Sequence, residues 1–192
     1  MKKFELTTEF ITNALGKKLF RIKALVEFGS VKAGELGGYA EKEENISQDG
    51  NAWVSDNAWV SDNALVFGDA KVSGNARVSD NARVFGDAKV SDNARVSGDA
   101  LISGNARVSG DAWVSDNADY ALVQGFGTEF RCTTFYRGKN KKIMVNCGCF
   151  HGDLEGFRKQ VKETRNGKIA KEYLMIADLM EYHFTSEDSS NE

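Results

Sequence analysis

The six residues Asn51-Ala52-Trp53-Val54-Ser55-Asp56 begin a stretch in which one hexapeptide pattern repeats without a gap as far as Asp116. In each repeat the first position is Asn or Asp, the second is Ala, the fourth is Val or, once, Ile102, and the sixth is Gly or Asp. A period this short is typical of a solenoid, because each unit buries its apolar side only by stacking on its neighbours.

Counted from the valine, each unit places an aliphatic residue and then, four positions later, an alanine. This pattern resembles the hexapeptide repeat of left-handed parallel β-helices. Three hexads would close a triangular coil, with Val and Ala inside and with Gly, Asp or Asn at corners that need left-handed backbone conformations. We therefore expect a mainly β chain: a left-handed parallel β-helix of about four coils, followed by a small α+β C-terminal unit.

The outward positions test a coil of three hexads, because residues 18 positions apart should then share a face. Phe replaces the usual Ser after the valine only at Phe67 and Phe85, which are 18 positions apart, and Leu65 and Leu101 belong to the same face. An exposed apolar patch of this kind marks interaction surfaces. The sequence therefore predicts an interface formed by Leu65, Phe67, Phe85 and Leu101.

The same spacing defines two further columns of outward residues. One contains Trp53, Lys71, Lys89 and Arg107, and the other contains Trp59, Arg77, Arg95 and Trp113. Arginines interleaved with tryptophans could follow a phosphate backbone and stack bases, so the second column is a candidate partner-binding surface. The corner acids make the repeats net acidic, however. The simpler interpretation of the column is a solvated face, and nucleic-acid binding is possible but not favoured.

Residues 1–50 are expected to form an N-terminal cap, since an uncapped solenoid edge would pair with other chains. The pattern predicts a short helix over Thr7–Leu15, a strand over residues 19–26 and an irregular first coil over residues 31–50. The lead-in from Leu36 to Glu41 resembles that of bacterial and prophage-encoded hexapeptide-repeat proteins of unassigned function. The β-helix itself is expected over residues 51–122.

Residues 128–184 are expected to form the C-terminal unit, after a linker at Gln124–Gly127, and residues 185–192 form an acidic tail. Strands at Glu129–Tyr136 and Lys142–Cys149 would make a β-hairpin, and helices are expected at Asp153–Arg165 and Lys168–Phe184. A hairpin with two helices is too small to bury much apolar surface alone. We therefore expect this unit to complete its core by docking on the solenoid.

The cysteines and one histidine of this unit form a candidate zinc site. If Cys147, Cys149 and His151 alternate along one strand and Cys132 lies across the hairpin, three thiolates and an imidazole would suit tetrahedral zinc. Ligands spaced along an extended strand would spread over about 13 Å, however. Buried reduced cysteines are the alternative, and we expect neither a metal nor another cofactor.

The resemblance to hexapeptide β-helices implies one enzymatic alternative, an acyltransferase that uses a histidine as general base. The solenoid contains no histidine, and the two in the chain, His151 and His183, lie in the C-terminal unit. We therefore expect no enzyme activity. Three cysteines, no signal segment at the start and no long apolar run favour a soluble, cytoplasmic chain without a membrane partner.

The function favoured by these patterns is a non-enzymatic binding or scaffold protein, encoded by a phage or prophage, that acts through protein–protein contacts. It would bind a protein partner, self-associate as a dimer or trimer, or do both. The prophage resemblance implies an alternative: a phage inhibitor of a host defence system, of the anti-CRISPR type, acting by protein binding or by nucleic-acid mimicry.

Overall fold

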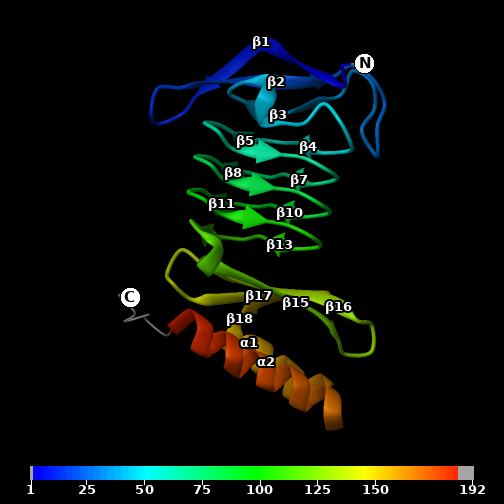
Figure 1. Cartoon of the computed structure of the whole chain (residues 1–192), viewed down its shortest axis with the longest axis vertical. Coiled ribbons are helices and arrows are strands. Elements are labelled where there is room, and N and C mark those ends of the chain that lie inside the picture. The colour runs from blue at the N-terminus through cyan, green and yellow to red at the C-terminus, as the bar shows by residue number, and fades with distance from the viewer. Residues whose placement is uncertain (1, 186–192) are drawn as a thin grey trace. The chain divides into compact units, whose positions relative to one another are not determined.

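The computed structural model describes residues 2–185, which form two compact units with the boundary between Asp116 and Asn117 (Figure 1). The first unit contains an N-terminal cap and the hexapeptide repeats. The second unit contains a separate β-sheet and two α-helices. Each unit is described by itself.

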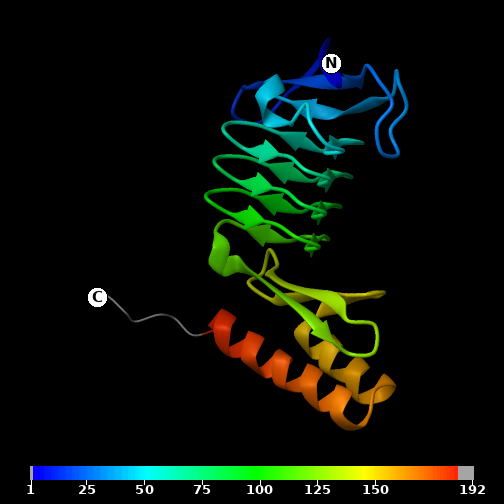
Figure 2. The same ribbon diagram turned by 45° about the vertical axis from the view of Figure 1, so that its right-hand side comes forward.

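The repeats form eleven two-residue strands, one in each hexad (Figure 2). They are β4 (Trp53–Val54), β5 (Trp59–Val60), β6 (Leu65–Val66), β7 (Lys71–Val72), β8 (Arg77–Val78), β9 (Arg83–Val84), β10 (Lys89–Val90), β11 (Arg95–Val96), β12 (Leu101–Ile102), β13 (Arg107–Val108) and β14 (Trp113–Val114). Every third strand pairs in parallel, which gives the sheets β4-β7-β10-β13, β6-β9-β12 and β5-β8-β11-β14. The predicted mainly β solenoid, with three hexads to a coil, is confirmed.

The inside of the solenoid contains the valine or isoleucine and the alanine of every repeat, and each of these side chains is at most 2% exposed. The corners have positive φ, as at Asp56 (57°) and Gly68 (69°). Glycine adopts this conformation without steric cost, and Asp tolerates it better than most residues. The predicted division into an apolar interior and corners with left-handed backbone conformations is therefore confirmed.

Polar corner side chains bond from one coil to the next. The Asn57 amide donates to Asn75 Oδ1 (3.4 Å), and Asn75 donates in turn to Asn93 Oδ1 (3.2 Å). At the preceding position, Asp56 Oδ2 accepts a hydrogen bond from the backbone N–H of Gly74 (2.9 Å). These bonds favour Asn or Asp at the first position of the repeats that make them.

The N-terminal cap adds the strands β1 (Phe4–Thr12), β2 (Lys18–Ala24) and β3 (Leu36–Ala40), and β3 runs parallel to β5. The predicted strand at residues 19–26 is confirmed as β2. The predicted helix at Thr7–Leu15 is wrong, because Asn13 forms a turn in which its Oδ1 accepts the N–H groups of Leu15 and Lys17. The chain therefore reverses, and β1 pairs antiparallel with β2.

The cap also covers part of the first regular coil. Trp53 occupies the outward column that the sequence predicts, yet it is only 3% exposed. The rings of Phe4 and Phe28 pack edge-on against it, with ring centroids 6.4 and 5.4 Å from the Trp53 centroid. The short 3-10 helix η1 (Glu43–Asn45) places the Asn45 amide between two coils, where it donates to the carbonyls of Asp62 and Ala64.

The second unit begins with the 3-10 helix η2 (Asn117–Asp119) and continues as an antiparallel sheet in the order β15-β16-β17-β18. Its elements are β15 (Tyr120–Phe126), β16 (Arg131–Arg137), β17 (Ile143–Cys147), β18 (Phe150–Asp153), α1 (Leu154–Thr164) and α2 (Gly167–Thr185). The hairpin and both helices are confirmed. The linker at Gln124–Gly127 is wrong, since Gln124–Phe126 end strand β15. The tail after Thr185 lies outside the described residues.

The second unit has a hydrophobic core of its own. The side chains of Phe135, Val145, Phe157, Ile176 and Phe184 are among those buried between the sheet and the helices. The unpredicted strands β15 and β18 contribute to this core through Ala121, Val123 and Phe150. Docking of the unit on the solenoid stays a prediction. Among the described residues, neither helix combines the length and apolar character needed to cross a bilayer.

Candidate functional site

The apolar stripe, defined as Leu65, Phe67, Phe85 and Leu101, lies on the outer side of the β6-β9-β12 sheet. The Phe67 and Phe85 rings stack with centroids 4.9 Å apart and planes within 3°. Both phenylalanines are half-buried, and Leu101 is 38% exposed. Arg83 pairs in register between the two leucines, so the continuous apolar part of the stripe is the phenylalanine pair.

A corner made only of glycines borders the stripe. Gly50, Gly68, Gly86 and Gly104 follow one another at this corner, all with positive φ. A Cβ atom on Gly86 would lie 3.0 Å from the backbone nitrogen of Gly104. No side chain therefore rises between the stacked rings and the next face of the solenoid.

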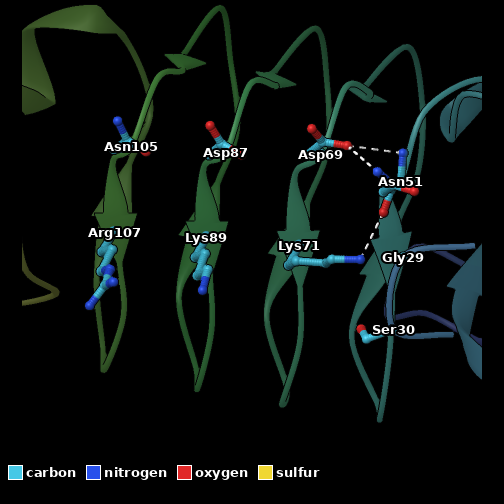
Figure 3. Close-up of a pocket in the computed structure, with 9 residues that line it drawn as sticks. All are labelled: Gly29, Ser30, Asn51, Asp69, Lys71, Asp87, Lys89, Asn105 and Arg107. Carbon is cyan, nitrogen blue, oxygen red and sulfur yellow. Dashed lines mark hydrogen bonds between the residues drawn. The ribbon is translucent and has the colours of Figure 1, made fainter.

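That next face carries the charged groove, a pocket of about 570 Å³ (Figure 3). One row of its lining contains Asn51, Asp69, Asp87 and Asn105, and a parallel row contains Lys71, Lys89 and Arg107. The loop residues Gly29 and Ser30 lie at the N-terminal end of the rows. The groove therefore presents hydrogen-bond acceptors and cations side by side, repeated from coil to coil.

The N-terminal end of the groove is held together by internal contacts. Lys71 Nζ donates to the carbonyl of Asn51 (2.7 Å), and Asp69 Oδ1 accepts from the Asn51 amide (2.7 Å). Burial lowers the pKa of Lys71, Lys89 lowers it further, and Asp69 opposes both effects. Lys71 and Asp69 are therefore partly committed to the solenoid itself.

The middle of the groove differs, because Asp87 and Lys89 are both exposed. Within the described residues, neither side chain makes a hydrogen bond or an ion pair. In Figure 3 a dashed hydrogen bond joins Lys71 to Asn51, whereas no dashed line reaches Lys89. A carboxylate acceptor and an ammonium donor are thus available to a ligand in adjacent positions.

The third face carries the predicted column Trp59, Arg77, Arg95 and Trp113, and the strand register places all four in one line. The guanidinium of Arg77 lies over the Trp59 ring and that of Arg95 over the Trp113 ring, each 5.6 Å from the centroid. Trp113 is 46% exposed. Binding of a partner by this column stays a prediction.

The Cys/His set is not brought together as the sequence suggested. Cys147 ends β17 and His151 lies in β18, with a turn at Gly148 (φ 61°) between them, so they do not alternate along one strand. Thr133, and not Cys132, lies opposite Cys147. In the described residues, no three His, Cys, Asp or Glu side chains lie close enough to hold a metal ion.

The two histidines occupy different places in the second unit. His151 is exposed, and its Nδ1 lies 2.7 Å from Asn146 Oδ1 and 3.4 Å from the Tyr136 hydroxyl. The His183 ring packs against Phe184 near the end of α2, with centroids 4.9 Å apart. Neither histidine belongs to the repeats.

Two surface features of the second unit were not predicted. Tyr173, Cys147 and Phe157 help to line a cavity of about 140 Å³, where burial and then Cys147 raise the pKa of Tyr173. On α2, Met175, Leu179 and Tyr182 are 61%, 58% and 72% exposed. Their spacing of four and three residues places them on one face of the helix. The sequence does not single out this exposed face, because the buried face of the same helix is apolar as well.

Comparison with known proteins bears on the repeats alone. A family model described as YdcK Beta solenoid repeat matches residues 70–86, 76–90 and 100–116. The repeats are similar to that solenoid. No curated protein matches the chain. The matches and the observed coils together support a repeat β-helix protein.

Proposed function

We propose that this chain is a non-enzymatic scaffold that binds a protein partner, or further copies of itself, through the apolar stripe. The observation that supports the proposal is the parallel stack of Phe67 and Phe85 on the outside of a rigid coil. The other repeats place Ser at the same position, so coil formation does not require the rings. The resemblance of the lead-in to prophage proteins extends the proposal to a phage or prophage origin.

The size of the stripe fits the centre of an interface. Covering both rings and both leucines would remove a few hundred Å² of apolar surface, worth on the order of 5–10 kcal/mol before the entropic cost of association. A second copy could cover the stripe symmetrically in a dimer or trimer. The glycine corner beside the rings allows a partner to approach without meeting a protruding side chain.

The double substitution Phe67→Ser with Phe85→Ser tests the proposal, because it restores the residue that the other repeats carry. We expect the solenoid to keep its β-sheet circular dichroism while light scattering shows a lower mass, or chemical crosslinking to the partner is lost. The matched control is Leu15→Ser with Leu36→Ser, at exposed cap positions (81% and 50%). Unchanged mass, crosslinks and protease resistance in the stripe variant would refute the proposal.

A further inference from the structure

We infer that the charged groove binds an acidic oligosaccharide, an extended chain of sugars that carry carboxylates, laid along the axis of the solenoid. The site consists of Asp87, Lys89 and Arg107, and the segment Gly29–Ser30 closes its N-terminal end. The inference does not depend on the apolar stripe, which lies on another face.

The chemistry of the groove selects a ligand that both donates and accepts hydrogen bonds. Lys89 and Arg107 are cationic donors suited to carboxylates, whereas Asp87 only accepts. Because Asp87 and Lys89 do not pair with each other, each can engage a ligand group without breaking an internal contact. Sugar hydroxyls supply donors for Asp87, and a uronate carboxylate supplies the acceptor for Lys89.

The spacing of the coils suits a polymer with one sugar per coil. Strands in neighbouring coils lie about 4.8 Å apart, so the cationic row and the Asp/Asn row repeat at that interval. An extended β-1,4-linked pyranose chain advances by a similar distance with each sugar, and its sugars alternate in orientation, so one side of the chain presents carboxylates and hydroxyls in turn to successive coils. The pocket of about 570 Å³ is lined from four successive coils, between Asn51 and Arg107, and lies in the usual size range of ligand pockets.

Other polymers fit the lining less well. The lining contains no aromatic ring on which bases could stack. An extended peptide advances only about 3.3 Å per residue, so its side chains would not match the coils. The lining also offers no apolar pocket for such side chains.

Isothermal titration of the full chain with oligouronates of three to six sugars tests the inference, with a neutral oligosaccharide of the same linkage as the ligand control. We expect saturable binding of the oligouronate and none of the neutral chain. Lys89→Ala should weaken binding about tenfold, as expected for the loss of one charge-assisted hydrogen bond. Arg95→Ala, at the equivalent position on another face, should leave the affinity unchanged.

A second substitution separates a sugar ligand from a simple polyanion. Asp87→Asn removes a charged acceptor for hydroxyls, so it should weaken oligouronate binding about threefold. Single-stranded DNA has no backbone hydroxyl that could donate to Asp87, so for it the same change only relieves repulsion of the phosphates and would strengthen binding. Tighter binding of the oligonucleotide than of the oligouronate, together with that reversed effect, would overturn the inference.

Two further outcomes would also overturn it: no measurable binding of oligouronates of any length, or equal binding of the neutral chain. The double stripe substitution keeps this test separate from the proposed function. Phe67→Ser with Phe85→Ser should leave oligouronate affinity unchanged, whatever it does to partner binding or mass.

Discussion

Val90 and Arg95 show how sharply the solenoid separates inward from outward residues. Val90 is 0% exposed in a prism of valine and alanine, whereas Arg95 lies on the surface beside Trp113. The inward positions of the described repeats hold only valine, isoleucine and alanine side chains. The loss of stability caused by a substitution should therefore depend more on whether the position faces inward or outward than on the type of the new residue.

Val90→Asp is expected to destabilise the first unit by more than about 3 kcal/mol, because it buries a carboxylate without a partner. Arg95→Asp should cost about 1 kcal/mol or less, the worth of an exposed cation–π contact. Chemical denaturation of both variants measures the difference. Equal losses would contradict the inward and outward assignment.

Lys3 is an unusual residue of the cap, since a lysine is almost fully buried there at 4% exposure. Its Nζ donates to the carbonyls of Gly50 (3.3 Å) and Ala52 (3.0 Å) and lies 4.8 Å from the Phe28 ring centroid. Burial, aided by Lys71, lowers the pKa of Lys3 to about 8, although Asp49 and Asp69 oppose the shift. The charged form of Lys3 is therefore less favoured in the folded chain than in the unfolded chain.

This lowered pKa predicts a pH dependence of stability. Between pH about 8 and 10.5 the unfolded chain holds the Lys3 proton more firmly than the folded chain does, so the Lys3 contribution to the free energy of unfolding rises with pH. Below pH about 8 the penalty for the buried charge is fully present. Denaturation across this window, compared with Lys3→Met, isolates the effect; an identical slope in the two proteins would contradict it.

Strand β3 joins the cap to the first regular coil through two glycines. A Cβ on Gly37 would lie 2.5 Å from Ile22 Cγ1, and one on Gly38 would lie 2.4 Å from the carbonyl oxygen of Ala58. Neither position has room for a methyl group. The close approach allows Tyr39 N–H to donate to that same carbonyl (2.9 Å) and continues the β-ladder from the coils into the cap.

Gly38→Ala is therefore expected to push β3 away from the coil and destabilise the cap by about 1–3 kcal/mol. Leu36→Ala, in the same strand but 50% exposed, is the control and should change stability little. Hydrogen exchange of the Tyr39 amide measures the effect locally. Equal protection of this amide in both variants would show that β3 can move without loss.

Elements followed from the sequence wherever the period was strict. Every hexad forms one strand and one corner, because the fixed spacing of Val and Ala allows both side chains to be buried only in this arrangement. Outside the repeats, β1 was mistaken for a helix because the turn at Asn13 depends on side-chain bonds that hydrophobic spacing does not record. The sequence does not predict strand β15, because Gly125 lies where its register with β16 shifts and Gly127 lies in the turn that follows.

The candidate surfaces were predictable to a different extent. The column positions of Phe67, Lys89 and Arg95 follow from the 18-residue spacing alone. The sequence could not show that Lys71 turns back to a carbonyl while Lys89 stays available, since identical residues in one column differ only in their neighbours along the axis. Burial of Trp53 was equally hidden, because Phe4 and Phe28 reach it from distant segments.

The whole molecule contains two separate hydrophobic cores, one of stacked aliphatic side chains and one of aromatic contacts. In the second core the Phe157 ring meets Phe135 and Tyr173 edge-on, each with centroids 5.9 Å apart. The buried residues of this cluster all belong to the second unit. The two units should therefore unfold in distinguishable steps.

Phe157→Ala in the full chain is expected to destabilise the second unit by about 3–5 kcal/mol, the usual range for removing a buried phenylalanine ring. Calorimetry should show one transition shifted and the solenoid transition unchanged. Leu179→Ala, at a site 58% exposed on α2, is the matched control and should shift neither. A common shift of both transitions after Phe157→Ala would mean that the units fold as one.

The three-hexad coil makes insertions and deletions unequal in their effects. Loss of one hexad, such as residues 75–80, would leave Val and Ala facing inward, so the interior would close again. Every downstream residue, however, would move to the neighbouring face, and Phe85 would no longer stack on Phe67. Loss of three hexads, such as residues 87–104, would return each later residue to its original face. Selection for folding alone would therefore permit change by single repeats, whereas selection for a surface would permit it only by whole coils.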